Sequence, residues 1–172
     1  MANHNHGISI LIAERRAAMA QHMRDFLTAR GFQVSCCNDA DACLAYADQQ
    51  FFDIILLAER LAGASTARVV ATLSERLPET VVIMTSPEPT VPAAVEAMRL
   101  GAFDFVPDPQ DDESLLAAVE QALQFRRLRR VNGERRQEIN RKYDVDNIVG
   151  QSRPMQEVFR LIHKVAATDA TV

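Results

Sequence analysis

The stretch that decides the fold is Ala94–Pro109, AVEAMRLGAFDFVPDP. Val95 and Met98 stand at helical spacing, and Gly101 follows at the point where a helix ends in a left-handed residue. Phe103–Pro107 then has the aromatic and β-branched character of a short strand. The stretch therefore predicts a helix, a glycine stop and a strand in quick succession.

The same alternation of strand and helix extends over the first 125 residues. Three apolar runs (ILI, IILL and VVIM) are typical of central strands in a parallel sheet covered on both faces. Five strand–helix repeats with short links predict a doubly wound α/β fold with right-handed crossovers. The expected strands are Ile8–Ala13, Phe32–Cys37, Asp53–Ala58, Thr80–Ser86 and Phe103–Pro107.

Charge divides the chain into parts. Residues 1–125 carry a net charge of −9, residues 126–142 carry +6, and residues 143–172 carry −1, within a total of −4. An acidic body of 1–125 joined to a basic stem of 126–146 indicates two units and a connector, and argues against a uniformly basic nucleic-acid binder. The stem reads either as a solvated linker helix or as a two-stranded coiled coil.

The composition indicates the class of protein and the cellular compartment. With 48% hydrophobic residues the chain can bury a core, and it contains no apolar run of the ~20 residues that a membrane span needs. Three clustered cysteines (Cys36, Cys37 and Cys43) lack metal-site spacing, and their odd number argues against a disulfide framework. We expect a reducing, cytoplasmic location and no membrane partner.

Polar residues collect where the expected strands end. In an open parallel sheet, ligands bind at the carboxyl ends of the strands. The residues there are Glu14-Arg15-Arg16 after the first strand, Ala58 closing the third, Thr85-Ser86 closing the fourth, and Asp108-Pro109 after the fifth.

At these residues the chain resembles a response-regulator receiver domain. The matching segments are ILIAERR, FDIILLAERLAG, VVIMTSPEP and, above all, AVEAMRLGAFDFVPDP. The resemblance implies a five-stranded, flavodoxin-like sheet of order 2-1-3-4-5. It also implies phosphoryl chemistry, in which an aspartate closing the third strand is the nucleophile and two acids after the first strand hold Mg²⁺. A hydroxyl residue and a lysine then bind the phosphoryl oxygens.

This sequence departs from that pattern at most of its chemical positions. Ala58 stands at the phosphoacceptor position, Arg15 replaces one metal ligand beside Glu14, and Asp108 replaces the lysine. Ser86 fits the hydroxyl position, with Thr85 as its neighbour. We therefore expect a degenerate pocket with no catalytic residue, no metal site and no cofactor.

Other residues leave alternatives open in the pocket. Strand alternation directs Glu59 away from it, and Asp53 lies at the opposite end of its strand, where it reads as a surface or capping residue. Glu14 and Asp108 could share a cation, Arg15 could pair with Asp108, or these positions have simply drifted.

The resemblance adds two further expectations. It puts Phe105 at the aromatic switch position, where the ring serves either as a switch or as plain core packing. It also suggests a cis bond between Asp108 and Pro109.

The C-terminal segment IVGQSRPMQEVFRLIHKVAATDATV carries a second resemblance. It is similar to the start of the AAA+ module of NtrC-family, sigma-54-dependent transcriptional activators, and we assign 147–172 to a truncated copy of that start. The phosphate-binding loop that would follow is not in this chain, so ATP is implied only for the parent protein.

The two resemblances together predict the regulatory domain of such an activator, and not an enzyme. It would be a two-component pseudo-receiver that forms a homodimer and controls assembly of the AAA+ ring through contacts. In the parent, that ring would act on sigma-54 RNA polymerase, and a C-terminal domain would bind DNA. Two alternatives remain: an atypical true phosphoacceptor, and a domain that senses a small ligand, such as an anion drawn to Arg15 and Arg16.

Overall fold

The computed structural model describes residues 7–63 and 65–143. Within them, five parallel strands form one sheet of order β2-β1-β3-β4-β5, which confirms the predicted order. The strands are β1 (Ser9–Ala13), β2 (Gln33–Cys37), β3 (Ile54–Ala58), β4 (Val81–Thr85) and β5 (Asp104–Val106). Each is slightly shorter than the sequence predicts.

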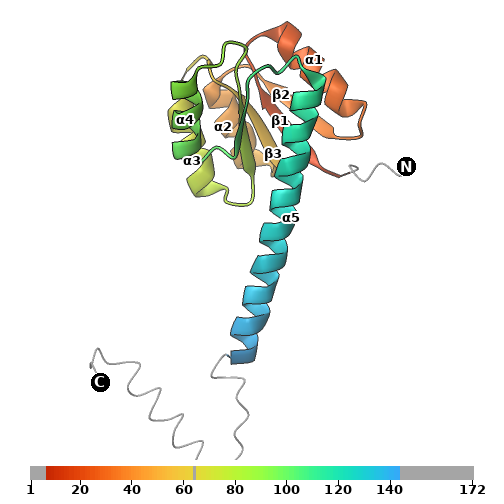
Figure 1. Cartoon of the computed structure of the whole chain (residues 1–172), viewed down its shortest axis with the longest axis vertical. Coiled ribbons are helices and arrows are strands. Elements are labelled where there is room, and N and C mark those ends of the chain that lie inside the picture. Colours follow the sequence, from red (N-terminus) through yellow and green to blue (C-terminus); the bar gives the residue numbers. More distant parts are fainter. Residues whose placement is uncertain (1–6, 64, 144–172) are drawn as a thin grey trace, which may run out of the picture. The chain divides into compact units, whose positions relative to one another are not determined.

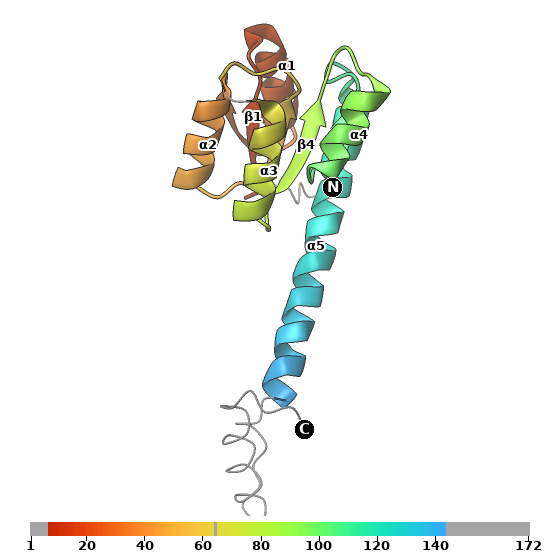
Figure 2. The same ribbon diagram turned by 90° about the vertical axis from the view of Figure 1, so that its left-hand side faces the viewer.

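Helices cover both faces of this sheet. They are α1 (Ala17–Thr28), α2 (Ala40–Gln49), α3 (Thr66–Arg76), α4 (Val91–Arg99) and α5 (Asp112–Tyr143). Figures 1 and 2 show α1 and α5 on one face and α2, α3 and α4 on the other. This is the two-sided arrangement expected of a doubly wound fold.

Strand alternation builds two separate cores. In β1, Ile10 and Ile12 pack into a cluster with α1 and α5, whereas Leu11 and Ala13 pack into a cluster with α2, α3 and α4. Successive side chains of a strand point to opposite faces, so every residue of a two-sided strand must be apolar. All residues of β3 and β4 are accordingly buried.

Local signals fix the helix ends. The side chains of Asp39, Ser65 and Thr90 cap α2, α3 and α4 by accepting a backbone N–H three residues further on. After α4, Gly101 has φ of +102°, and a Cβ there would lie 2.6 Å from Ser74 Oγ. A left-handed backbone and a close neighbour both require glycine at this position.

The chain beyond the sheet is described only in part. Residues up to Arg127 belong to one compact unit, and Leu128 is the first residue of a second. Helix α5 continues to Tyr143, so much of the predicted stem is helical. The predicted AAA+ segment 147–172 lies outside the described residues. Among the residues searched, none of the helices combines the length and apolar character needed to span a membrane.

Candidate functional site

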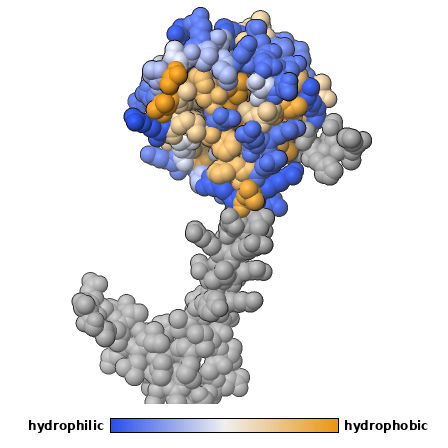
Figure 3. All heavy atoms as spheres, viewed as in Figure 1, coloured by the Kyte–Doolittle hydropathy of each residue, from blue (hydrophilic) through white to orange (hydrophobic). Residues whose placement is uncertain are grey.

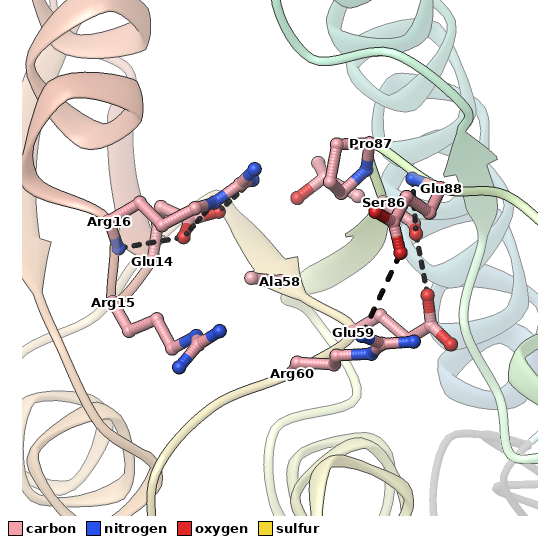
Figure 4. A pocket seen from close by; sticks show the side chains of 10 residues that line it. Glu14, Arg15, Arg16, Ala58, Glu59, Arg60, Ser86, Pro87 and Glu88 are labelled. Carbon is pink, nitrogen blue, oxygen red and sulfur yellow. Dashed lines mark hydrogen bonds and ion pairs between the residues drawn. The ribbon is translucent and has the colours of Figure 1, made fainter.

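A cavity of about 210 Å³ opens at the carboxyl edge of the sheet (Figure 4). It lies where β1, β3 and β4 end, which is the region that the sequence analysis singled out. Four of the five predicted pocket residues line it, and Asp108 does not. The lining residues are Glu14, Arg15, Arg16, Ala58, Glu59, Arg60, Thr85, Ser86, Pro87 and Glu88.

The carboxylate of Glu14 is buried and fully engaged by Arg16. Arg16 donates from Nε to Oε1 and from Nη2 to Oε2, both at 3.0 Å, and its backbone N–H donates to Oε1 at 2.8 Å. Hydrogen bonding to Glu14 raises the pKa of Arg16 above its ordinary value. A two-pronged contact of this kind fixes both side chains.

Glu59 faces the cavity, so the expectation that it points away is wrong. Its carboxylate accepts a hydrogen bond from the Ser86 hydroxyl at 2.5 Å, and Ser86 Oγ in turn accepts the backbone N–H of Glu88 at 3.3 Å. Strand alternation fails here because β3 ends at Ala58 and Glu59 already belongs to the following bend. The acid and the hydroxyl are thus paired with one another.

Ala58 and Thr85 lie at the floor of the cavity, where β3 and β4 end. Ala58 closes β3 with a buried methyl group, and Thr85, which closes β4, is also buried. Mg²⁺ takes oxygen ligands, but Arg16 holds both oxygens of Glu14 and a cation, Arg15, follows directly. The residues present do not fit the metal that the receiver pattern implies.

Arg15 and Asp108 do not form the ion pair that the sequence left open. Asp108 Oδ1 accepts the backbone N–H of Gln110 at 3.0 Å, so its carboxylate is used within the turn that precedes α5. A cation shared by Glu14 and Asp108 stays a prediction; Arg16 already engages Glu14, and Asp108 does not line the cavity. The suggested cis bond is also wrong, because all described peptide bonds, including Asp108–Pro109, are trans.

Arg15 is the cavity's uncommitted charge. Its side chain is exposed and makes no hydrogen bond or ion pair with the described residues, and none of the dashed interactions in Figure 4 reaches it. Arg60, by contrast, lies 3.8 Å from a carboxylate oxygen of Glu88, although both of these side chains are largely exposed.

The aromatic at the switch position is half-buried. Phe105 packs against the core cluster beneath α2, α3 and α4. Its backbone N–H donates to Oδ1 of Asp104 at 2.8 Å. This placement agrees with plain core packing, and the switch role stays a prediction.

Sequence reasoning missed a second polar cluster at the amino edge of the sheet. Asp53 accepts the backbone N–H of Ser9 at 2.6 Å and the Ser9 hydroxyl at 3.0 Å, and it forms an ion pair with Arg126 of α5. Arg126 Nε also donates to the carbonyl of Glu79 at 2.9 Å, and its guanidinium lies 5.5 Å from the Phe51 ring centroid. The sequence analysis predicted a surface or capping role for Asp53. It could not predict the ion pair with Arg126, because the two residues are 73 positions apart and no local sequence pattern connects them.

Comparison with known proteins decides the family. The response regulator receiver domain family matches residues 10–120. The chain belongs to this family. The predicted receiver domain is therefore confirmed.

The similar proteins are transcriptional regulators and receiver domains. The regulator ZraR of Escherichia coli is 29% identical over 96% of this chain, and the C4-dicarboxylate transport regulator DctD of Pseudomonas aeruginosa is 27% identical over 95%. Each match spans 36% of the relative, so this chain corresponds to about a third of their length.

Solved structures agree with this assignment. NtrX from Brucella abortus aligns with a TM-score of 0.67 and 25% identity, over 95% of this chain and 36% of that one. A CheY-like receiver domain from Methanospirillum hungatei aligns over 71% of this chain and 98% of its own, with a TM-score of 0.67 and 20% identity. The latter likeness concerns the fold alone.

Proposed function

We propose that this chain is the receiver region of a sigma-54-dependent transcriptional regulator and that it works without forming an aspartyl phosphate. The observation that carries the second part is the methyl group of Ala58 at the floor of the cavity. A phosphoryl group needs a nucleophilic atom to accept it, and the alanine side chain offers none.

The surroundings of Ala58 support the same proposal. Arg16 engages the one acid that remains after β1, and Ser86 engages Glu59. Both carboxylates thus already have a hydrogen-bonding partner within the pocket. Pocket groups that stabilise one another favour a single fixed conformation over a phosphorylation switch.

The extent of the matches to known regulators supports the proposal that this chain is part of a sigma-54-dependent regulator. The matches to ZraR and DctD cover at least 95% of this chain and therefore continue past the receiver match that ends at residue 120. We assign 147–172 to the start of an AAA+ module on this ground. ATP hydrolysis, action on sigma-54 RNA polymerase and DNA binding would belong to the remainder of the protein, in the cytoplasm.

The output would pass through surface contacts. On α4, Val91, Val95 and Met98 are 78%, 47% and 49% exposed and recur at helical spacing. Figure 3 shows apolar surface in this part of the unit. We propose that this face mediates homodimerisation and so controls ring assembly, with the basic stem as a coiled coil.

Two experiments test these proposals. Titration with fluoroberyllate and Mg²⁺ should leave the amide spectrum without a Mg²⁺-dependent change, whereas a saturable, Mg²⁺-dependent change along β3, β4 and β5 would overturn phosphorylation independence.

Sedimentation should show that the wild type is a dimer and that Val95→Glu is a monomer. Arg68→Glu, on α3, is the charge-changing control and should remain a dimer. A monomeric wild type would overturn the proposal of a dimer.

A further inference from the structure

We propose that the cavity at the carboxyl edge binds a small oxyanion of phosphate size, noncovalently, through the guanidinium of Arg15. The inference rests on the proposed function in one respect, because it requires that no carboxylate occupies the position of Ala58. The proposal gives a class of ligand to a pocket that, under the proposed function, does not accept a phosphoryl group.

The first argument is the balance of charges around the cavity. Three carboxylates and three guanidinium groups line it. Arg16 is committed to Glu14 by two side-chain hydrogen bonds, and Glu59 is bonded to a hydroxyl. Arg15 has no such partner in the described chain, so its charge is available for a ligand.

The second argument is the position of that charge. Arg15 directly follows Glu14 at the end of β1, and Ala58 ends the neighbouring strand β3. In Figure 4 the side chain of Arg15 extends on the same side of the site as Arg60, away from the Arg16–Glu14 pair. Because alanine presents only a methyl group, no fixed negative charge at the floor repels an incoming anion.

The third argument is the fit between the cavity and the ligand class. A volume of about 210 Å³ is several times the ~30 Å³ that one water molecule occupies in the liquid, so a tetrahedral oxyanion can enter. A guanidinium presents parallel N–H donors that match two oxygens of a phosphate or a carboxylate. Arg60, held only loosely by Glu88 at 3.8 Å, is placed to add a second cation.

The carboxylates at the border of the cavity also limit the charge of the ligand. Glu59 and Glu88 border the cavity, so a highly charged polyanion would meet repulsion on that side. The shared chemistry is thus a small oxyanion, which could be free inorganic phosphate or the acidic group of a small metabolite.

The test uses the full chain and isothermal titration at constant ionic strength, with inorganic phosphate and acetate as separate probes. We expect saturable phosphate binding that Arg15→Gln weakens at least tenfold. Arg15→Lys should weaken phosphate binding less, because lysine keeps the positive charge but lacks the parallel N–H donors of a guanidinium. Arg68→Gln, which removes an exposed arginine on α3, should bind as the wild type does.

A second pair of variants tests the floor of the cavity. Ala58→Asp should abolish phosphate binding by placing a carboxylate opposite Arg15, whereas Ala58→Asn has the same size without the charge and should retain binding. Thermal unfolding of each variant shows that it is folded. Equal binding of acetate would support a general oxyanion site, and binding of phosphate alone would support a phosphate site.

The outcomes separate this inference from the proposed function. No saturable binding of either probe, or equal binding by wild type and Arg15→Gln, would overturn the anion site and leave the proposed function untouched. A covalent phosphoryl adduct on the chain after treatment with acetyl phosphate would overturn the proposed function instead. Phosphate binding that depends on Arg15, with no adduct, supports both.

Discussion

The two edges of the sheet differ in what their polar residues do. At the amino edge, Asp53 ties together the start of β1, the start of β3 and helix α5 through Ser9 and Arg126. At the carboxyl edge, pairs such as Arg16 with Glu14 and Ser86 with Glu59 surround an open cavity. The amino edge is tied to helix α5 by a largely buried ion pair, whereas the carboxyl edge holds a pocket.

This difference separates the residues that stabilise the fold from those that line the pocket. The two apolar clusters on either side of the sheet do not involve the pocket carboxylates. Changes at the carboxyl edge therefore affect chemistry more than stability, and changes at the amino edge should do the opposite. Three substitutions test this contrast, and the largest effect is expected at the amino edge.

Asp53→Ala should lower the free energy of unfolding by about 3 kcal/mol. The side chains of Asp53 and Arg126 are only 15% and 21% exposed, so the substitution leaves a poorly solvated guanidinium and removes the carboxylate acceptor of the Ser9 backbone N–H. Urea denaturation measures the loss. Asp48→Ala, which breaks an exposed pair with Arg76, is the control and should cost ~1 kcal/mol or less.

Glu14→Gln should cost about 1 kcal/mol, because Arg16 is partly exposed and water can solvate it once the charge is gone. The raised pKa of Arg16 contributes stability that is present below the ordinary arginine value and is lost only as pH rises through the raised one. The difference between variant and wild type should thus stay constant between about pH 7 and about pH 9. A loss as large as that of Asp53→Ala would remove the contrast between the edges.

Ser114→Ala should have the smallest effect. Asp111 precedes α5, and its carboxylate accepts the Ser114 hydroxyl at 2.5 Å, a contact that lowers the pKa of Asp111. A lowered pKa contributes stability above the unfolded value that is lost as pH falls through the folded one. NMR titration should show the pKa of Asp111 moving back up in the variant; an unchanged pKa would show that the hydroxyl does not matter.

Much of the fold could be predicted because its signals are local. Apolar runs marked the buried strands, and Gly101 marked the end of α4. Strand ends were less certain: Thr80 lies before β4, where its hydroxyl donates to the carbonyl of Phe52 at 2.8 Å, although it has strand-like character.

The site was harder to predict because its pairs depend on geometry beyond the strands. Six residues of the cavity followed from their places at strand ends, namely Glu14, Arg15, Arg16, Ala58, Thr85 and Ser86. The partner of Glu14 could not be predicted in this way, because Arg15 and Arg16 are adjacent in sequence. Only the path of the backbone after β1 decides that the Arg16 side chain, and not that of Arg15, reaches the Glu14 carboxylate. Glu59 was misplaced because alternation stops where the strand stops, and Arg126 was missed because its partner is remote in sequence.

The most direct test of the account is the intact mass of the full chain after incubation with acetyl phosphate and Mg²⁺. Wild type should gain no phosphoryl group, because Ala58 cannot accept one and Glu59 is bonded to Ser86. Glu59→Gln, measured alongside, should look the same. A phosphoryl adduct on the wild type would contradict the account, and its loss in Glu59→Gln would identify that carboxylate as the acceptor.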